Sequence, residues 1–152
     1  PAAAAAQKDV IPQAFRNETP MATLFVSALF FNNLRARRMY ILIVEDDPYL
    51  SYDLKEALVV LHADVREART VRAAMLVLGD GLPYLAILDY NLKTETTAAV
   101  AARLARENVP FCYVTADVER VRADPAIPDC PIVAKPYRVE DVTRMAAMLL
   151  NM

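Results

Sequence analysis

Residues 40–48 read YILIVEDDP, a run of five apolar residues followed by three acids and a proline. A short, continuous apolar run with turn signals after it is typical of a strand that is buried on both faces of a sheet. Glu45, Asp46 and Asp47 stand where this strand would end. The stretch therefore predicts a strand of a parallel sheet that leads into an acidic loop.

The same alternation continues to the C-terminus, where short apolar runs are separated by stretches of helical periodicity. We predict further strands at 63–67, 84–88, 111–114 and 132–134, and helices at about 49–62, 71–78, 94–108 and 139–151. Strands that alternate with helices through right-handed crossovers make an α/β fold, a doubly wound, five-stranded parallel sheet with helices on both faces.

The composition fits one globular unit with a short appendage. The chain has 152 residues, of which 56% are hydrophobic and 24% are charged, so it can bury a core. It has 17 basic residues against 19 acids and no basic stripe, which argues against a nucleic-acid partner. The single histidine, His62, excludes a Cys/His zinc cluster and is interpreted as a helix-end residue. Cys112 and Cys130 are isolated, which predicts reduced thiols and a cytoplasmic location.

Residues 1–38 differ from the rest in charge. They hold five basic and two acidic residues, a net charge of +3, which leaves 12 basic and 17 acidic residues, a net charge of −5, in 39–152. We therefore predict an N-terminal extension over 1–38 with an apolar helix at about 20–34, and a separate domain over 39–152. The longest uncharged stretch, 19–34, has 16 residues and is too short to span a membrane. This helix could form a homodimer, pack on its own domain, contact a membrane surface or be foreign to the native protein.

Polar side chains follow four of the five predicted strands. Glu45 and Asp46 follow the first strand, Asp89 the third, Thr115 the fourth and Lys135 the fifth. The carboxyl ends of parallel strands share one edge of the sheet, which is where open α/β sheets bind ligands. We therefore predict that these side chains form one site.

The chemistry of this predicted site follows from its charges. Three converging carboxylates repel one another unless a cation offsets them, and Mg²⁺ prefers a few carboxylates together with phosphate oxygens. Lys135 and Thr115 would supply a positive charge and a hydroxyl to the other oxygens of a phosphoryl group. Asp89, the central acid, is the candidate nucleophile because a carboxylate can accept a phosphoryl group as an acyl phosphate.

Residues 40–150 resemble the receiver domain of response regulators in two-component signalling. The resemblance rests on ILIVEDDP at 41–48, ILDYNL at 87–92, Thr115-Ala116 and Lys135-Pro136. It implies a flavodoxin-like sheet with strand order 2-1-3-4-5.

The resemblance also implies roles for individual residues. Glu45 and Asp46 match the acidic pair that holds Mg²⁺, and Asp89 matches the phosphorylated aspartate. Asn91 matches the residue whose backbone carbonyl completes the metal shell. Thr115 and Lys135 match the hydroxyl and the lysine that contact the phosphoryl group. The implied partner is a histidine kinase or a histidine phosphotransfer protein.

The sequence also departs from most receivers. The loop after Asp89 lacks their proline and glycine, Ile132 stands where most have an aromatic switch residue, and three prolines shorten the helix expected before it. These features resemble the atypical FAT GUY receivers, often single-domain partners of HWE-type histidine kinases. Of the Phe-Ala-Thr-Gly signature only Thr115 persists.

These observations favour a stand-alone phosphoacceptor receiver that signals by protein contact and is no enzyme beyond its own phosphorylation. One alternative is a pseudo-receiver, a constitutive interaction or dimerisation module that is never phosphorylated. Another is a Mg²⁺-dependent phosphatase-like enzyme, but Asn91 stands where such an enzyme would need a second acid, and nothing in the sequence would cap a substrate pocket.

Overall fold

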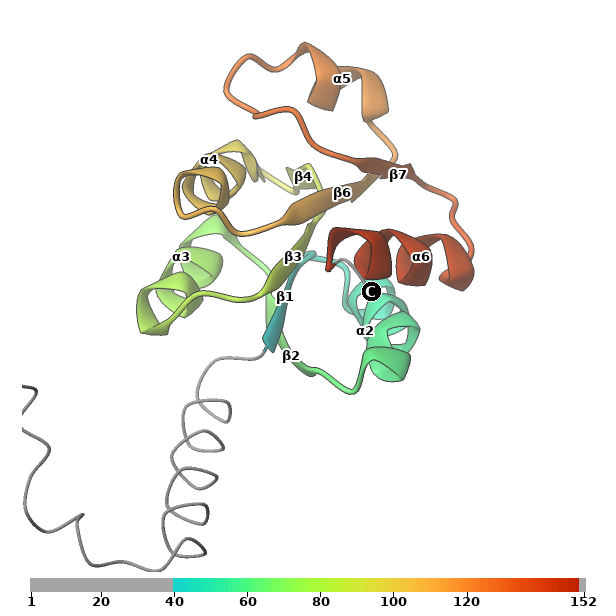
Figure 1. Cartoon of the computed structure of the whole chain (residues 1–152). Helices are drawn as coiled ribbons and strands as arrows, with labels where there is room; N and C mark the ends of the chain where they lie inside the picture. The colour runs from blue at the N-terminus through green and yellow to red at the C-terminus, as the bar shows by residue number, and fades with distance from the viewer. Residues whose placement is uncertain (1–39, 151–152) are drawn as a thin grey trace, which may run out of the picture. The chain divides into compact units, whose positions relative to one another are not determined.

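The computed structural model describes residues 40–150, which form an α/β fold around a five-stranded sheet (Figure 1). The strands are β1 (Tyr40–Val44), β2 (Asp64–Ala68), β3 (Leu85–Leu88), β6 (Phe111–Thr115) and β7 (Ile132–Ala134). All neighbouring strands are parallel, in the order β2-β1-β3-β6-β7. Numbered within this sheet, the order is the predicted 2-1-3-4-5. The predicted boundary near residue 39 and the apolar helix at 20–34 lie outside the described residues.

Helices cover both faces of the sheet (Figure 1). They are α2 (Pro48–Leu58) and α6 (Val139–Leu149) on one face and α3 (Val71–Asp80) and α4 (Ala98–Arg106) on the other, with the short α5 (Val118–Ala123) beyond β6. Because these helices cover both faces, the ends of the sheet are left to bind ligands.

None of the helices within 40–150 is long and apolar enough to cross a bilayer.

Strand β1 shows why a continuous apolar run predicts a central strand. All five of its residues are buried. Leu42 and Val44 pack into the core under α3 and α4, whereas Ile41 and Ile43 pack into the core under α2 and α6. Because successive side chains point to opposite faces, a strand that is covered on both faces needs an apolar residue at every position.

The segment after Asp89 differs from the prediction of a helix over 94–108. The chain first forms a two-stranded antiparallel hairpin, β4 (Asn91–Leu92) and β5 (Glu95–Thr96), and α4 begins only at Ala98. Lys93, the first residue of the two-residue hairpin loop, has a positive φ of 41°. Helix α4 ends at Arg106, and Asn108 follows it in the left-handed region. The hairpin forms because buried Leu92 anchors it in the core, a tertiary contact that helical propensity does not report.

The other predicted elements are present with shifted ends. The helix predicted over 49–62 stops at Leu58 and continues as a 3₁₀ turn, η2 (Val59–Leu61), and His62 ends that turn with a left-handed φ of 50°. Helix α5 has six residues, as the prolines that follow it predicted. The predicted β7 agrees at both ends, and α6 stops at Leu149.

Candidate functional site

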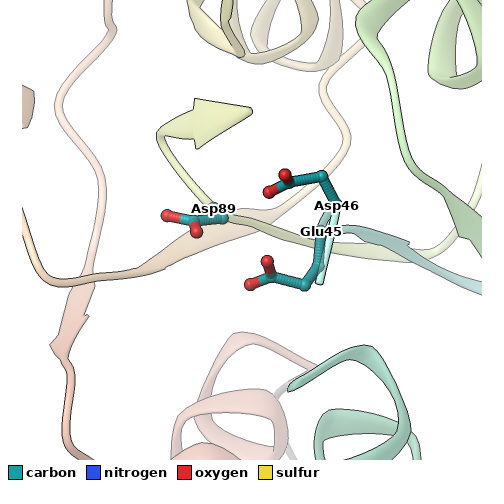
Figure 2. Close-up of side chains that lie close together, drawn as sticks. All are labelled: Glu45, Asp46 and Asp89. Atoms are coloured by element: carbon teal, nitrogen blue, oxygen red, sulfur yellow. The ribbon is translucent and has the colours of Figure 1, made fainter. Parts of the chain in front are cut away.

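Three carboxylates meet at the carboxyl edge of the sheet. Glu45 and Asp46 directly follow β1, and Asp89 directly follows β3, the neighbour of β1 in the sheet. One oxygen from each lies within 4.8 Å of the others (Figure 2). The predicted convergence of these acids is therefore present, and it follows from the parallel order of the strands.

Lys135 lies between two of these carboxylates. Its Nζ donates to Glu45 Oε2 at 2.8 Å and to Asp89 Oδ2 at 2.7 Å. Burial alone would lower the pKa of Lys135, but its hydrogen bonds and charge interactions with Asp89 and Glu45 outweigh burial and raise that pKa. The ammonium group therefore stays charged at neutral pH and compensates two negative charges.

Glu45 is the most deeply buried of the three acids, with 1% of its side chain exposed. Burial raises its pKa, and the hydrogen bonds from Lys135 and from the backbone N–H of Asp47 oppose that shift. The Asp47 N–H donates to Glu45 Oε1 at 3.1 Å. This bond fixes the carboxylate on the side of the edge where Lys135 lies.

Asp47, the third acid after β1, is not part of the cluster of three carboxylates. It caps α2, because one of its carboxylate oxygens accepts from the N–H groups of Tyr49 at 2.8 Å and Leu50 at 3.2 Å. An aspartate is a favoured residue at a helix N-terminus. The acidic pair Glu45 and Asp46 thus faces the site, while Asp47 begins the helix that follows.

The backbone around Asp89 is held from two sides. Its N–H donates to the carbonyl of Val44 at 2.8 Å, and its own carbonyl accepts from Thr97 Oγ1 at 2.7 Å. Thr97, just before α4, has no exposed surface. Asp89 is therefore anchored both to β1 and to the start of α4. Sequence reasoning did not find Thr97, because no local pattern marks a bond that spans eight residues.

Thr115 ends β6 and is buried. Its backbone carbonyl accepts from the Lys135 N–H at 2.9 Å, which ties the ends of β6 and β7 together. Its Oγ1 accepts from the N–H of Asp117 at 3.1 Å. The hydroxyl is thus engaged with the turn before α5.

Asn91 lies in β4, two residues after Asp89. Its side-chain amide donates to Asp117 Oδ2 at 2.7 Å and accepts from Arg120 at 3.3 Å. The predicted role of the Asn91 backbone carbonyl as a metal ligand stays a prediction. Sequence reasoning missed Asp117, which directly precedes α5, and Arg120, which lies in it, although their spacing of three residues is that of helical ion pairs.

The residues present fit a magnesium ion. Within residues 40–150, one ammonium group lies close to these three carboxylates, that of Lys135. Lys93 lies 4.0 Å from Asp46 and is mostly exposed. Hard carboxylate oxygens at the mouth of a site are the ligands that Mg²⁺ prefers. A cavity of about 500 Å³ opens beside Asp46 between Arg69, Thr70 and the hairpin loop, which leaves room for coordinated water.

Solved structures of known proteins share this fold. SdrG from Sphingomonas melonis is 33% identical, with a TM-score of 0.62, and the match covers 75% of this chain and 98% of SdrG. The receiver (REC) domain of the PhyR response regulator from Erythrobacter litoralis is 25% identical, with a TM-score of 0.67, over 78% of this chain and 94% of that domain. The chain belongs to the response regulator receiver domains. No protein-family model and no curated protein matches the sequence.

Other receiver domains match in fold alone. The CheY-like receiver domain protein from Methanospirillum hungatei is 21% identical, with a TM-score of 0.64, over 74% of this chain and 94% of that chain.

In the present chain, Ile132 lies on β7 opposite Tyr113 of β6. The position that the resemblance assigns to an aromatic switch therefore holds a partly buried aliphatic side chain.

Proposed function

We propose that this receiver domain is a stand-alone phosphoacceptor of a two-component phosphorelay. A phosphohistidine on a histidine kinase or a histidine phosphotransfer protein would donate its phosphoryl group to Asp89. The observation that carries this proposal is the pair of hydrogen bonds from Lys135 to Asp89 and Glu45, at 2.7 and 2.8 Å. They place a cation beside the nucleophile, where the charge of the phosphoryl group would develop.

The step itself is a transfer between two partners. The P–N bond of the phosphohistidine breaks as a P–O bond forms to a carboxylate oxygen of Asp89, and the imidazole leaves as a neutral group once it carries a proton. Lys135 would then move from the Asp89 carboxylate to the phosphoryl oxygens, and Thr115 would donate its hydroxyl to another. The receiver supplies position and charge neutralisation rather than turnover, so it is not an enzyme in the usual sense.

Mg²⁺ is the cofactor of this proposal. Glu45, Asp46, Asp89 and the backbone carbonyl of Asn91 would hold it, and it would neutralise phosphoryl charge. The cluster of carboxylate oxygens within 4.8 Å supports the first three of these residues.

The output would be protein contact, in the cytoplasm and without a nucleic-acid partner. The stand-alone role and the pairing with an HWE-type kinase rest on the resemblance to FAT GUY receivers. A homodimer through the segment 20–34 remains a further part of the proposal. One observation favours the pseudo-receiver alternative: Ile132 leaves Thr115 without the aromatic partner that most receivers have.

Intact-protein mass spectrometry with phosphoramidate and Mg²⁺ tests the proposal. Wild type should gain the mass of one phosphoryl group, and Asp89→Asn should gain none. Asp47→Asn is the matched control, because it neutralises a neighbouring acid that caps α2 and should leave phosphorylation intact. A wild-type protein that gains no phosphoryl group under these conditions would support the pseudo-receiver and overturn the proposal.

A further inference from the structure

The residue directly after Asp89 is an aromatic that reaches α5. Tyr90 is 5% exposed, and its hydroxyl donates to Asp124 Oδ2 at 3.0 Å. Asp124 directly follows α5 as its C-cap residue. Tyr90 therefore connects the backbone of the acceptor residue with the far end of α5, 34 residues away in the sequence.

The ring of Tyr90 makes a second contact with α5. The guanidinium carbon of Arg120 lies 5.3 Å from the ring centroid, within the range of a cation–π interaction. Arg120 also donates to Asp117 at 3.0 Å, and Asp117 is the residue before α5 begins. The two residues after Asp89, Tyr90 and Asn91, thus hold the helix at its middle and at both of its ends.

Few other contacts within residues 40–150 hold helix α5. It has six residues, and Val121 is its only buried one. Asp117 makes no side-chain cap to the helix N-terminus, because its carboxylate bonds to Asn91 and Arg120 instead. With about one apolar side chain buried, polar contacts decide where this helix lies.

The same contacts lead back to Thr115. The Asp117 N–H donates to Thr115 Oγ1 at 3.1 Å. If Thr115 turns toward a phosphoryl group, its oxygen leaves this N–H, and the turn before α5 loses one of its bonds. A change at Asp89 therefore acts on the start of α5 through Thr115 and on its middle and end through Tyr90.

We propose that Tyr90 is the aromatic residue that transmits the state of Asp89 to α5. It would take the role of the aromatic switch residue, because Ile132 stands where most receivers have that aromatic. This inference rests on the proposed function, because it requires a phosphoryl group on Asp89. Tyr90 is a positioning residue: it touches α5 rather than the reacting atoms. Its hydroxyl and its ring hold α5 in the unphosphorylated arrangement and shift it when the backbone of 89–90 moves.

Beryllofluoride, which mimics a phosphoryl group on an aspartate, provides the test. With Mg²⁺ and beryllofluoride, amide NMR shifts of wild type should change around Asp89 and across 117–124, and fluorine NMR should show the bound ligand. Tyr90→Phe removes only the hydroxyl. This variant should bind the ligand, but the shift changes across 117–124 should fall to about half or less. The variant loses the hydrogen bond from Tyr90 to Asp124, whereas the connection from Thr115 to Asp117 remains.

Tyr113→Phe is the matched control. Tyr113 is a second buried tyrosine in the same core, and its ring is 6.2 Å from that of Tyr90. Its hydroxyl accepts a hydrogen bond from Thr97 Oγ1 at 3.4 Å, whereas the Tyr90 hydroxyl donates to Asp124. It should keep the full response of 117–124. A full response in Tyr90→Phe, an equal loss in Tyr113→Phe, or bound ligand in wild type without any response of 117–124 would each overturn the proposal. Wild type without bound ligand would overturn the proposed function and this inference with it.

Discussion

At the scale of single residues, charge balance governs the site. Lys135 compensates Glu45 and Asp89 through bonds of 2.8 and 2.7 Å. Among the residues that the structure describes, Asp46 pairs only with the exposed Lys93, at 4.0 Å. An exposed pair at 4.0 Å contributes little stability. Asp46 is therefore the carboxylate whose charge is least compensated in the absence of a metal ion.

Asp46→Asn should change stability in opposite directions without and with Mg²⁺. In EDTA the substitution removes repulsion and should raise the free energy of unfolding by about 0.2–1 kcal/mol. With Mg²⁺ at a hundred times its dissociation constant, wild type should gain about 2.7 kcal/mol and the variant much less. Urea unfolding measures both, and Asp47→Asn serves as the control that keeps the Mg²⁺ gain. An equal gain in Asp46→Asn and wild type would remove Asp46 from the metal site.

The two cysteines should react slowly with alkylating reagents. Burial raises the pKa of Cys130 to about 11 and that of Cys112 to about 12. A raised pKa keeps the thiol neutral, so at pH 8 roughly one Cys130 in a thousand is a thiolate, and the fraction rises about tenfold per pH unit up to its pKa.

Iodoacetamide labelling followed by mass spectrometry between pH 8 and pH 10 measures this dependence. Cys130→Ser should remove the labelling, because buried Cys112 reacts only when the protein unfolds. A labelling rate that levels off near pH 8.5, as for an ordinary cysteine, would contradict the raised pKa.

At the scale of elements, the hairpin β4–β5 joins the site to α3. Its Glu95 carboxylate accepts from the N–H of Val71, the first residue of α3, at 2.9 Å. Thr70 caps the same helix end through the N–H of Ala73 at 3.0 Å. A carboxylate from a distant segment thus satisfies a free N–H and faces the positive end of the helix dipole.

Glu95→Ala should lower the free energy of unfolding by about 0.5–1.5 kcal/mol, because the Val71 N–H loses its partner. Glu95→Gln keeps an oxygen acceptor but loses the charge, so its effect should be smaller. Urea denaturation measures both. Glu56→Ala is the matched control, since Glu56 is exposed on α2 and should change stability little. A loss as large in Glu56→Ala as in Glu95→Ala would argue against the helix-end contact.

At the scale of the whole molecule, the apolar segment before the receiver domain leads to a prediction about oligomeric state. The segment 19–34 carries no charge and contains several large apolar residues. A continuous apolar patch beyond a few hundred Å² is rare on a monomer, so we expect this segment to be covered. Burial of two aromatic and two or three aliphatic side chains at about 1.5–3 kcal/mol each is enough to hold an interface.

Sedimentation velocity of the full chain and of a version that begins at Met39 tests this expectation. The full chain should sediment as a dimer and the shorter version as a monomer, because a symmetric pair would cover the segment in both copies. A full chain that sediments as a monomer would remove the dimer. Equal sedimentation of both as dimers would place the interface on the receiver domain instead.

The parallel sheet and the convergence of the acids could be predicted from local rules: the apolar run 40–44 requires burial on two faces, and parallel strands bring their following residues to one edge. Glu45, Asp46, Asp89 and Lys135 meet for this reason. The residues that resemble the site of a receiver domain also stand directly after the predicted strands. They are the acids Glu45, Asp46 and Asp89, the hydroxyl residue Thr115 and the amine Lys135. The order of the strands came instead from the resemblance to receiver domains, and the structure has that order.

Only the tertiary structure decided what happens after Asp89 and around α5. The segment 94–97 has a helical pattern, yet buried Leu92 and the bond from Thr97 to the Asp89 carbonyl make it a hairpin. The bond between Tyr90 and Asp124 has no local signature either. Periodicity reports which face of an element is buried, because burial repeats along the chain. It does not report which distant polar partner a side chain meets, because that depends on how the elements pack.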